Sequence, residues 1–591
     1  MQIPDNFQTG RSGESEIKYL IALAALCLVM NFYGIGRLPF IGPDEPRYAE
    51  VAVEMYQSGD WISPRLGGHF WYEKPALTYW VSALGYQFFG VSEFAARLGI
   101  AIIASLSVLL LYFFGKRIRS ARLGYLSATV LVTCGLWPGF SRGATFDMPL
   151  AATIELTLIS FFLWESKEPY AAGSRQYAEE GERSTEVKKY AAYRLLHTAC
   201  YNGWWWIFWF ALGLATLSKG LVGIVLPLLV IAPYLLLTKR VRVLNNPPLL
   251  LGGLSIFMAT AASWYGPMIA RHGSDFINEF FIGHHYRRFV SNDYRHPQPF
   301  YFFIFVAIAG CFPWCCYLAG GAWQSIKQLR SLDRVRIFLW LWVLAPIVFF
   351  SFSGSKLPGY ILPVFPPMAL LIGFELEQWW AEKEPKRMKF LAPATAILIL
   401  VVAIGFGLRG EYELGLSLLD AFKVATIAIV VAVVYLALWF LLNGRVATLF
   451  LPFGLALIIF ATVNLVFPVL GKNESLREFS LMAKSAARSG ERLVFFLNND
   501  QGINYYATEL PLRDQRSDLI TVRNLEALES QIWTNGQPAI LVASEGYWTG
   551  GLKDNARLSF EWLGAQKRYP RCSPACDWNL FRVTLRGDGR P

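Results

Sequence analysis

Hydrophobic residues gather in long unbroken blocks along this chain and do not follow the spacing of amphipathic helices. Residues 98–114 and 424–442, for example, are almost entirely apolar. A helix needs about 20 such residues to cross the hydrocarbon core of a bilayer. By apolar length we count about thirteen predicted membrane spans, at residues 19–36, 98–114, 123–140, 148–164, 203–217, 221–237, 248–269, 299–320, 337–352, 359–376, 390–408, 421–442 and 448–470.

Two blocks near the N-terminus need separate interpretation. Residues 19–33 follow Arg11 and Lys18 and so resemble a signal peptide, but they lack a small-residue cleavage site. We therefore interpret them as a retained first span. Residues 75–89 are apolar but only about fifteen residues long, which is short for a span. We expect this segment to lie at the membrane interface or to re-enter the membrane.

Clusters of Lys and Arg between the blocks predict the orientation of the chain, because cytoplasmic loops of membrane proteins are enriched in these residues. The predicted spans, with a cytoplasmic N-terminus, place every large basic cluster inside, namely 115–122, 239–242, 327–336, 383–389 and the segment 167–194. The same scheme places outside the C-terminal region and the loops 39–74, 141–147, 218–220, 271–298 and 353–358.

The C-terminal residues 471–591 have the pattern of a small soluble α/β domain. Strand-like segments lie at 493–497, 539–543 and 580–583, and helix-like segments at 476–489 and 524–533. We thus predict two domains, an all-α polytopic membrane domain over residues 1–470 and a periplasmic α/β domain over 471–591. An oxidising compartment favours a Cys572–Cys576 disulfide, with two free thiols as the alternative.

Composition agrees with a membrane protein. Hydrophobic residues make up 54% of the chain and charged residues 16%, whereas soluble domains carry about 25% charged residues. The net charge of +11 lies mostly in short loops and does not predict nucleic-acid binding. The cysteines show no metal pattern, and we expect those in or beside apolar blocks to be small core residues, namely Cys27, Cys134, Cys311, Cys315 and Cys316.

The first outer loop contains the densest set of candidate functional residues. Asp44 and Glu45 precede Pro46, an arrangement that starts a helix. Asp44 is therefore either a helix cap or a catalytic carboxylate that acts as a general base or orients an acceptor, and Glu45 is a second catalytic candidate. The same loop continues with Arg47 and Tyr48 and ends with Glu73 and Lys74.

Two of these side chains are candidates for holding phosphate oxygens. Arg47 presents a planar fork of donors and Lys74 a point charge, and both suit a phosphate. Lys74 also stands directly before the interfacial segment 75–89, at the depth of a lipid headgroup. The alternative is that Lys74 extends to the interface only to keep its charge in water. We count Tyr48 and Glu73 among the candidate substrate-binding residues of this loop.

The long outer loop is unexpectedly basic for its side of the membrane. It carries Arg271, Arg287, Arg288 and Arg295, which indicates an anionic ligand. Its histidines are candidate ligands of a divalent cation together with Glu73 or Glu279, although their spacing matches no established metal pattern and hydrogen-bonding histidines are an equal alternative. The candidate metal ligands are thus Glu73, His284, His285 and His296.

A third outer segment, residues 353–367, is rich in proline and supplies Lys356 as a phosphate candidate and Tyr360 as a hydrogen-bond donor. Prolines at the start of a span free backbone groups that a cavity could use. Asp147 is a further catalytic candidate, and an ion pair with Arg142 is its structural alternative. Lys219 has the same interfacial alternative as Lys74.

Several of these segments together resemble a known family. They are Asp44-Glu-Pro-Arg-Tyr-Ala-Glu50, Gly59-Asp-Trp61, Tyr72-Glu-Lys-Pro75, the phenylalanine, histidine and arginine loop after Glu279, and Lys356-Leu-Pro with Tyr360. They resemble family 83 of the membrane glycosyltransferases, which have the C-type fold. The resemblance covers the membrane half, roughly residues 19–470, and the first-loop motif is its most specific part.

The resemblance implies transfer of 4-amino-4-deoxy-L-arabinose, or a related sugar, from undecaprenyl phosphate to a lipid A phosphate with inversion, in the bacterial inner membrane. It assigns the catalytic carboxylate to Asp44. It assigns the carrier phosphate to Lys74, Arg47 and an arginine of the long loop, and it places Glu73 and either His284 or His285 nearby. No cofactor is required, although a divalent cation is compatible. The partners are the lipid-linked donor, an anionic envelope acceptor and membrane lipid, without nucleic acid.

Two other functions remain open from the sequence. The acceptor could be a protein hydroxyl or another envelope glycan, and Asp44 would then act as a true general base. A transporter of lipid or sugar is the rival from another class. Transporters usually show internal repeats and polar sites near the midplane, whereas the candidate residues of this chain gather in outer loops.

Overall fold

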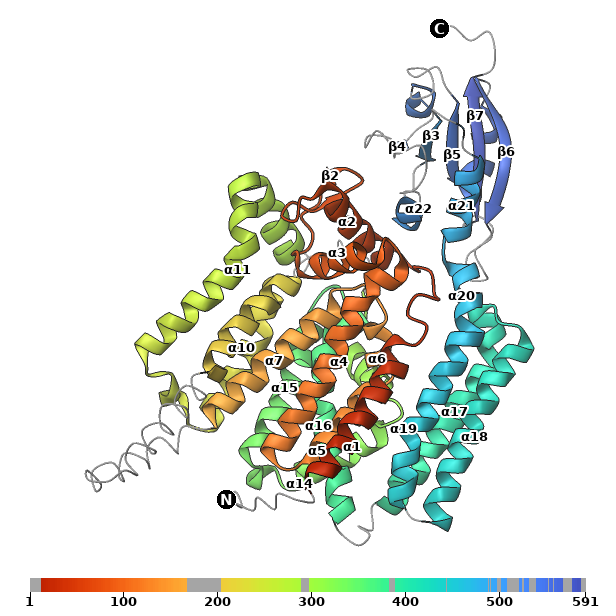
Figure 1. Ribbon diagram of the computed structural model, residues 1–591. Coiled ribbons are helices and arrows are strands. Elements are labelled where there is room, and N and C mark those ends of the chain that lie inside the picture. Colours follow the sequence, from red (N-terminus) through yellow and green to blue (C-terminus); the bar gives the residue numbers. More distant parts are fainter. Residues whose placement is uncertain are drawn as a thin grey trace, which may run out of the picture.

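The computed structural model is a helical bundle that carries a small sheet domain at one end (Figure 1). It describes residues 12–166, 203–287, 297–381, 388–442, 444–486, 488, 491–496, 501–506, 520–522, 526–530, 538–550, 552–555, 557–566 and 577–585. The predicted basic segment 167–194 and the predicted Cys572–Cys576 disulfide lie outside these residues. An all-α membrane domain with a C-terminal α/β domain, as predicted, is confirmed.

The apolar blocks of the sequence fold as helices. In chain order they form α1 (Ser12–Cys27), η1 (Leu28–Phe32), α4 (Glu93–Ile118), α5 (Ala121–Thr133), α6 (Leu136–Ser141), α7 (Asp147–Glu165), a helix over 203–219, α10 (Val222–Leu237), α11 (Pro247–Phe276), α13 (Phe302–Gly310), α14 (Cys315–Lys327), α15 (Arg334–Ser351), η5 (Pro358–Val364), α16 (Phe365–Ala381), α17 (Met388–Leu414), α18 (Leu418–Leu441) and α19 (Gly444–Ala461).

Fewer of the described helices than of the predicted spans are long enough to cross a membrane. Among the described residues, eight helices are long and apolar enough to cross a membrane, or up to nine if the bent pair α13 and α14 is one span. The chain bends by 117° between these two helices. The predicted block 123–140 is also divided, into α5 and α6. Breaks of this kind interrupt apolar runs without changing their composition, so about thirteen spans stays a prediction.

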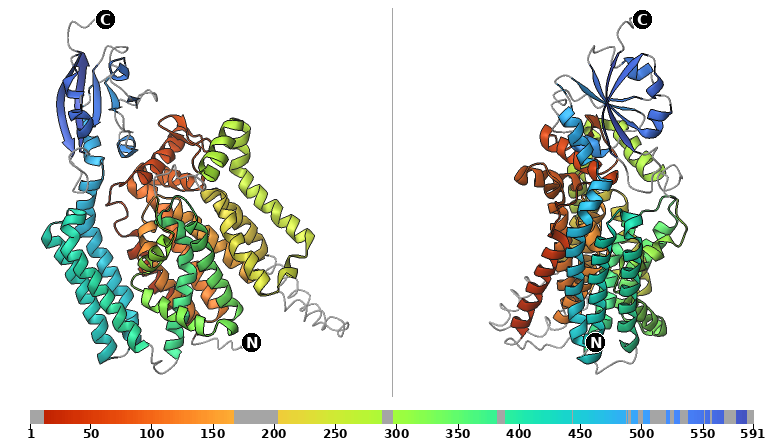
Figure 2. Two further views of the ribbon diagram at one scale, coloured as in Figure 1. Left: turned by 180° about the vertical axis from the view of Figure 1, so that it is seen from behind. Right: turned by 90° about the vertical axis from the view of Figure 1, so that its right-hand side faces the viewer.

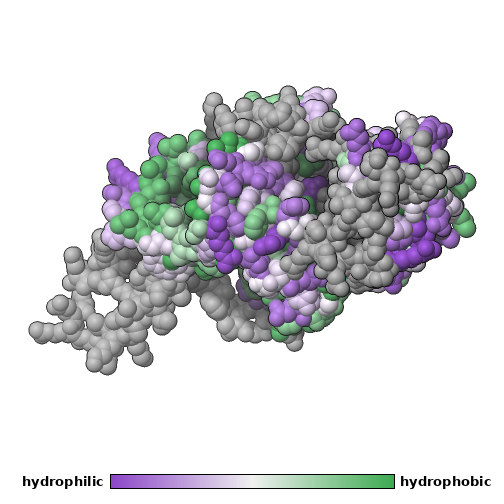
Figure 3. Space-filling model, turned by 90° about the horizontal axis from the view of Figure 1, so that it is seen from above, coloured by the Kyte–Doolittle hydropathy of each residue, from purple (hydrophilic) through white to green (hydrophobic). Residues whose placement is uncertain are grey.

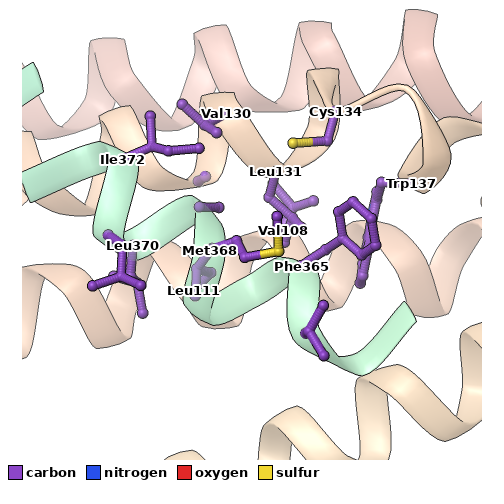
Figure 4. Packing of buried hydrophobic residues seen from close by; sticks show 14 of the residues in the cluster. Val108, Leu111, Val130, Leu131, Cys134, Trp137, Phe365, Met368, Leu370 and Ile372 are labelled. Carbon is purple, nitrogen blue, oxygen red and sulfur yellow. The ribbon is translucent and has the colours of Figure 1, made fainter. Parts of the chain in front are cut away.

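Close approach of backbones holds the centre of the bundle together. A methyl group added at Gly124 of α5 would lie 2.2 Å from the carbonyl oxygen of Tyr112 in α4. One added at Gly373 of α16 would lie 2.1 Å from the hydroxyl of Ser127. Small residues allow helices to pack this closely where no hydrophobic effect drives them together. The apolar side chains of α4, α5 and α16 fill the space between them (Figure 4).

One end of the bundle is covered by the first loop of the chain. Helix α2 (Asp44–Ser58) and helix α3 (Leu77–Phe89) lie there, joined by a short hairpin of β1 (Arg65–Leu66) and β2 (His69–Phe70) (Figure 1). The start of α1 and the turns 119–120 and 238–246 lie at the opposite end. The segment 75–89 therefore contributes a helix across the end of the bundle, which we call the loop end.

The C-terminal part continues from α19 through η6 (Thr462–Val466), α20 (Phe467–Glu474) and α21 (Arg477–Ala486) into a five-stranded sheet. The strand order is β4-β3-β5-β7-β6. The three predicted strands form β3 (Arg492–Phe496), β5 (Ala539–Ser544) and β7 (Trp578–Leu585), whereas β4 (Ile520–Val522) and the edge strand β6 (Leu558–Gln566) were not predicted. This domain stands on the same side as the loop end (Figure 2).

Candidate functional site

Asp44 is the first residue of α2 at the loop end. Pro43 occupies the N-cap position and makes no side-chain capping bond. The Asp44 side chain is 50% exposed and forms an ion pair with Arg47 at 3.4 Å. A negative charge in the first turn is stabilised by the helix dipole. Asp44 is thus a carboxylate that is held in place but remains open to a reactant.

Asp44 belongs to a group of four charges, which we call the four-charge group: Asp44, Arg47, Glu73 and Lys74. The Glu73 carboxylate lies between the two cations, 2.8 Å from the Lys74 ammonium and 3.7 Å from the Arg47 guanidinium. Glu73 and Lys74 are both buried. The Nε of Arg47 is buried and has no acceptor among the described residues. An anionic ligand would supply that missing acceptor.

Glu45 points away from the four-charge group and into the protein. Its carboxylate accepts from the Nε and Nη2 of Arg97 at 2.6 and 2.8 Å, and from the Ala144 backbone N–H at 2.9 Å. Arg97 is 2% exposed and Glu45 9%. A bidentate pair of this kind fixes both geometry and charge. We therefore infer that Glu45 holds the start of α2 in place.

Arg97 is a residue that our sequence reasoning missed. It lies in the second turn of α4, directly before the block 98–114, and it contacts the segment that leads to α2 by donating to the Ile35 carbonyl at 2.9 Å. A usable signal was present, because an ionisable residue at the edge of an apolar span rarely lacks a partner. The sequence separation of 52 residues from Glu45 hid that partner.

Tyr48 is buried beneath the four-charge group. Its ring packs edge-on against Phe146 at 4.7 Å between centroids, and Tyr79 lies 6.5 Å away. Burial raises the pKa of the Tyr48 hydroxyl well above its usual range, and the charges of Glu73 and Asp44 raise it further. The structure thus places Tyr48 in the apolar support of α2, and its contact with Phe146 joins α2 to the start of α7.

A second cluster lies directly after Phe146. The Asp147 carboxylate accepts a hydrogen bond from the Lys219 ammonium, and that ammonium lies 4.8 Å from the ring centre of Tyr360. A methyl group added at Gly359 would lie 2.5 Å from the Asp147 carboxylate, so the segment 358–360 packs directly on it. Asp147, Lys219 and Tyr360 are thus brought together from three separate segments at the loop end, and we call them the Asp147 cluster.

The alternative ion pair between Arg142 and Asp147 does not form. The Arg142 guanidinium instead donates to the backbone carbonyls of Val29, Met30 and Tyr33 at 2.8, 2.8 and 2.6 Å. The last carbonyls of a helix lack partners within the helix. Arg142 satisfies these groups at the end of η1, and Asp147 is left to pair with Lys219.

Lys356 is a buried cation that precedes Tyr360 of the Asp147 cluster by four residues. Its ammonium donates to the Ser353 carbonyl at 2.6 Å. The whole residue is 7% exposed. Among the described residues no carboxylate lies within ion-pair distance of it. The Ser355 hydroxyl is also buried and, in the described part of the chain, has no hydrogen-bond partner. A buried cation without a counter-charge favours the binding of an anion.

The start of the long loop 271–298 is fixed to the first loop. Arg271 donates to Asp60 at 2.9 Å, and the His272 ring lies 2.8 Å from the Ser63 hydroxyl. Gly273 follows with a φ of 52°, which glycine adopts without strain, and breaks the helix there. The structure therefore places Arg271 in a contact that joins the two loops, with its side chain half exposed.

The described part of the long loop offers a pair of candidate cation ligands. The Glu279 carboxylate lies 3.8 Å from the His284 Nε2. Burial raises the pKa of Glu279, and the nearby Glu73 charge raises it further. No group of three His, Cys, Asp or Glu side chains that could hold a metal is present among the described residues. The His285 side chain and the whole of His296 lie outside them, as do Arg288 and Arg295.

Polar residues gather over the middle of the loop end when it is viewed from above (Figure 3). The four-charge group and the Asp147 cluster both lie at the loop end. The contact of Tyr48 with Phe146 joins the helices that carry them. Cations of this arrangement can hold phosphate oxygens. The half-exposed Asp44 can accept a proton or orient an acceptor.

The fold defines the class of protein to which this chain is similar. The crystal structure of ArnT from Cupriavidus metallidurans bound to undecaprenyl phosphate matches it with a TM-score of 0.74 and 23% identity, over 97% of this chain and 99% of that chain. The apo structure of the same protein matches with a TM-score of 0.74 and 24% identity, over 96% and 98%. The chain has the C-type fold predicted from its motifs.

In sequence, the chain is similar to undecaprenyl phosphate-alpha-4-amino-4-deoxy-L-arabinose arabinosyl transferases. That of Enterobacter sp. (strain 638) is 31% identical over 371 residues, 61% of each chain. That of Pseudomonas aeruginosa (strain UCBPP-PA14) is 34% identical over 339 residues, 57% of this chain and 55% of the relative. The chain thus spans about six-tenths of the length of these relatives. The Dolichyl-phosphate-mannose-protein mannosyltransferase family model matches residues 73–172.

Proposed function

We propose that this protein is a membrane glycosyltransferase that moves 4-amino-4-deoxy-L-arabinose, or a related sugar, from undecaprenyl phosphate to an anionic acceptor. The observation that carries the proposal is the four-charge group at the loop end, in which the half-exposed Asp44 pairs with Arg47 and the buried Glu73 lies between Arg47 and Lys74. The similarity to the arabinosyl transferases supports the choice of sugar and carrier.

The proposed reaction is a single displacement at the anomeric carbon of the sugar. An acceptor oxygen forms the new bond to this carbon on one face, while the bond to the carrier phosphate breaks on the other. The electron pair of the broken bond leaves with the phosphate. Cations that contact the phosphate stabilise this growing charge in the transition state. We assign that role to Arg47 and Lys74, with Lys356 as a further cation.

Asp44 acts on the acceptor side of this reaction. If the acceptor is a lipid A phosphate, its oxygen is already largely ionised, and Asp44 orients the group or takes its remaining proton. If the acceptor is a hydroxyl, Asp44 must remove its proton as a general base. The match to the protein mannosyltransferase family model keeps a protein hydroxyl as the second candidate acceptor.

A defined transfer assay tests the proposal. The purified protein is incubated with synthetic undecaprenyl phosphate carrying the aminosugar and, in parallel, with lipid A, a peptide bearing hydroxyls, or no acceptor. Mass spectrometry of each acceptor reports the transferred sugar. Modified lipid A supports the proposal and a modified peptide the second candidate. Movement of the donor across vesicle membranes without transfer to any acceptor would favour a transporter instead.

We also propose that the loop end and the C-terminal domain face the periplasm. In intact cells, His69→Cys in the exposed strand β2 is expected to react with a thiol reagent that does not cross membranes, whereas Arg117→Cys at the opposite end is not. Both changes are made with Cys572 and Cys576 replaced by Ser to remove background. Labelling of Arg117→Cys from outside would contradict this orientation.

Lys74→Ala is expected to weaken carrier binding while the protein remains folded. A charge-assisted contact with a phosphate contributes about 1.5–3 kcal/mol, or roughly 10–150-fold in affinity. The measurement is the dissociation constant for undecaprenyl phosphate together with the rate of transfer. Lys423→Ala is the matched control, because Lys423 pairs with Asp420 at 2.9 Å on the distant helix α18. Normal binding and transfer by Lys74→Ala would limit Lys74 to its buried ion pair with Glu73.

The proposed reaction does not require a divalent cation. If one binds, Glu279 and His284 are the described residues best placed to hold it, with Glu73 near enough to influence Glu279. Such a cation would add positive charge near the departing phosphate. Transfer by protein treated with a chelator, with and without added Zn²⁺ or Mg²⁺, tests the requirement.

A further inference from the structure

The C-terminal domain touches the segment that leads into Asp44. We call residues 35–43, which join the first span to α2, the strap. The short helix α22 (Gln501–Tyr506) lies at the edge of the C-terminal domain that faces α2 (Figure 2). The Tyr506 hydroxyl accepts from the backbone N–H of Phe40 at 2.8 Å and donates to the Glu93 carboxylate at 2.9 Å. One side chain of the domain thereby bridges the strap and the first turn of α4.

Apolar contacts surround this hydrogen-bonded bridge. The Tyr505 ring packs edge-on against Phe40 at 4.7 Å between centroids and is 4% exposed. Tyr505 shares a buried cluster with Ala49 and other core residues of α2. Helix α20 also approaches the strap, since a methyl group added at Gly471 would lie 2.7 Å from the Pro39 ring. The contact is therefore built into the core beneath α2.

The strap is held from the membrane domain as well. Arg97 donates to the backbone carbonyls of Ile35 and Leu38 and pairs with Glu45. On the side of the C-terminal domain, Arg477 of α21 lies 3.6 Å from Glu93 of α4 and so adds a charged contact between the two domains. The strap thus lies between a cation of the membrane domain and two tyrosines of the C-terminal domain.

The route from this contact to Asp44 is short. Phe40 precedes Asp44 by four residues, and Gly42, with a φ of 68° and open space around it, lies between them. A glycine adopts many backbone conformations at low cost. The place of the Asp44 carboxylate therefore depends on how firmly the chain is fixed on either side of Gly42. Glu45 fixes one side, and Phe40 with its tyrosine contacts fixes the other.

We propose that Tyr505 and Tyr506 are positioning residues, through which the docked C-terminal domain holds the strap and so orients the Asp44 carboxylate for sugar transfer. The inference rests on the proposed function for its kinetic consequence. It gives the C-terminal domain a role in the reaction through its contacts with the strap. The tyrosines act on the chemical step and leave the phosphate-binding cations unaffected.

The first test is Tyr506→Phe, which removes only the bridging oxygen. We expect kcat to fall by about tenfold, because a buried backbone donor and a carboxylate both lose a partner. We expect KM for the lipid-linked donor to stay within about twofold, because uniform binding of the donor is unchanged. Tyr547→Phe is the matched control, since Tyr547 lies in the same domain with its ring against Phe496.

A crosslink separates positioning from a general loss of structure. Pro39→Cys and Gly471→Cys place two thiols where the strap meets α20, because a methyl group at Gly471 would lie 2.7 Å from the Pro39 ring, and a disulfide needs two close Cβ atoms. In the Tyr506→Phe protein, oxidation of this pair is expected to restore kcat, and reduction to lower it again. An oxidised pair that leaves kcat low would overturn the proposal.

Hydrogen exchange gives a readout that does not depend on activity. Amides of residues 35–50 are expected to exchange faster in Tyr506→Phe than in the unmodified protein, while those of α7 do not change. Unchanged exchange at the strap overturns the docking contact, whether or not sugar is transferred. An unmodified protein that transfers no sugar overturns the proposed function instead, and normal kcat in Tyr506→Phe overturns the positioning role alone.

Discussion

Asp44→Asn is expected to abolish most sugar transfer while the fold is retained. Asparagine keeps the size of the side chain and its ability to accept hydrogen bonds but lacks the charge that a general base or an orienting carboxylate needs. We expect the rate to fall by about a hundredfold or more, the usual scale for a positioned acid or base. Because Pro43 occupies the N-cap position, Asp44 is not needed to cap α2. Single-turnover transfer and thermal unfolding are the two measurements.

The matched control for this change is Asp420→Asn. Asp420 also lies in the first turn of a helix and also pairs with a cation three residues later, but on α18. We expect this control to transfer sugar normally. Undecaprenyl phosphate should still bind to Asp44→Asn, since Arg47 and Lys74 remain. Full activity in Asp44→Asn would remove Asp44 from the chemistry and leave Asp147 as the next carboxylate to test.

Arg97→Met is expected to cause the largest loss of stability. The change leaves the buried Glu45 carboxylate without its cation and removes the donor to the Ile35 carbonyl. Breaking a buried ion pair by removing one partner costs about 3–5 kcal/mol. We expect a lower unfolding temperature in detergent and a reduced yield of monodisperse protein. The exposed pair of Arg557 and Glu529 supplies the control, because Arg557→Met should cost about 1 kcal/mol or less.

A second variant identifies the cause of that loss. Glu45→Gln combined with Arg97→Met removes the buried charge, yet glutamine can still accept from the Ala144 N–H. Replacing both members of a buried pair is less harmful than removing one. We therefore expect the double variant to be more stable than Arg97→Met alone. Equal stability of the two would mean that the unpaired charge is not what destabilises the protein.

The membrane fold was largely predictable because apolar length is a local property of the sequence. The blocks 98–114 and 148–164 lie within single helices, α4 and α7. The breaks were not predictable, since the 117° bend between α13 and α14 depends on how both pieces pack. The edge strand β6 was missed for a similar reason. Its pairing with β7 is set by a partner that follows it in the chain.

The site was predictable only where its members are close in sequence. Asp44 and Arg47 lie one helical turn apart, and Glu73 precedes Lys74 directly, so a shared loop could be inferred. Ion pairs across the fold were not. Lys219 and Asp147 are 72 residues apart, and the nearer Arg142 was the more natural partner for Asp147 on sequence grounds. Sequence shows which charges are present, whereas tertiary packing decides which of them pair.

The helical rod that carries the C-terminal domain also sets its height and its rotation. Residues Gly444–Glu474 form one apolar helix of 31 residues, which at about 1.5 Å per residue is roughly 45 Å long. The hydrocarbon core of a bilayer is about 30 Å thick. The rod therefore projects beyond the lipid tails by about the depth of a headgroup layer. Each added residue would turn the domain by about 100°. The length of the rod thus sets the height and the rotation at which the tyrosines of α22 contact the strap.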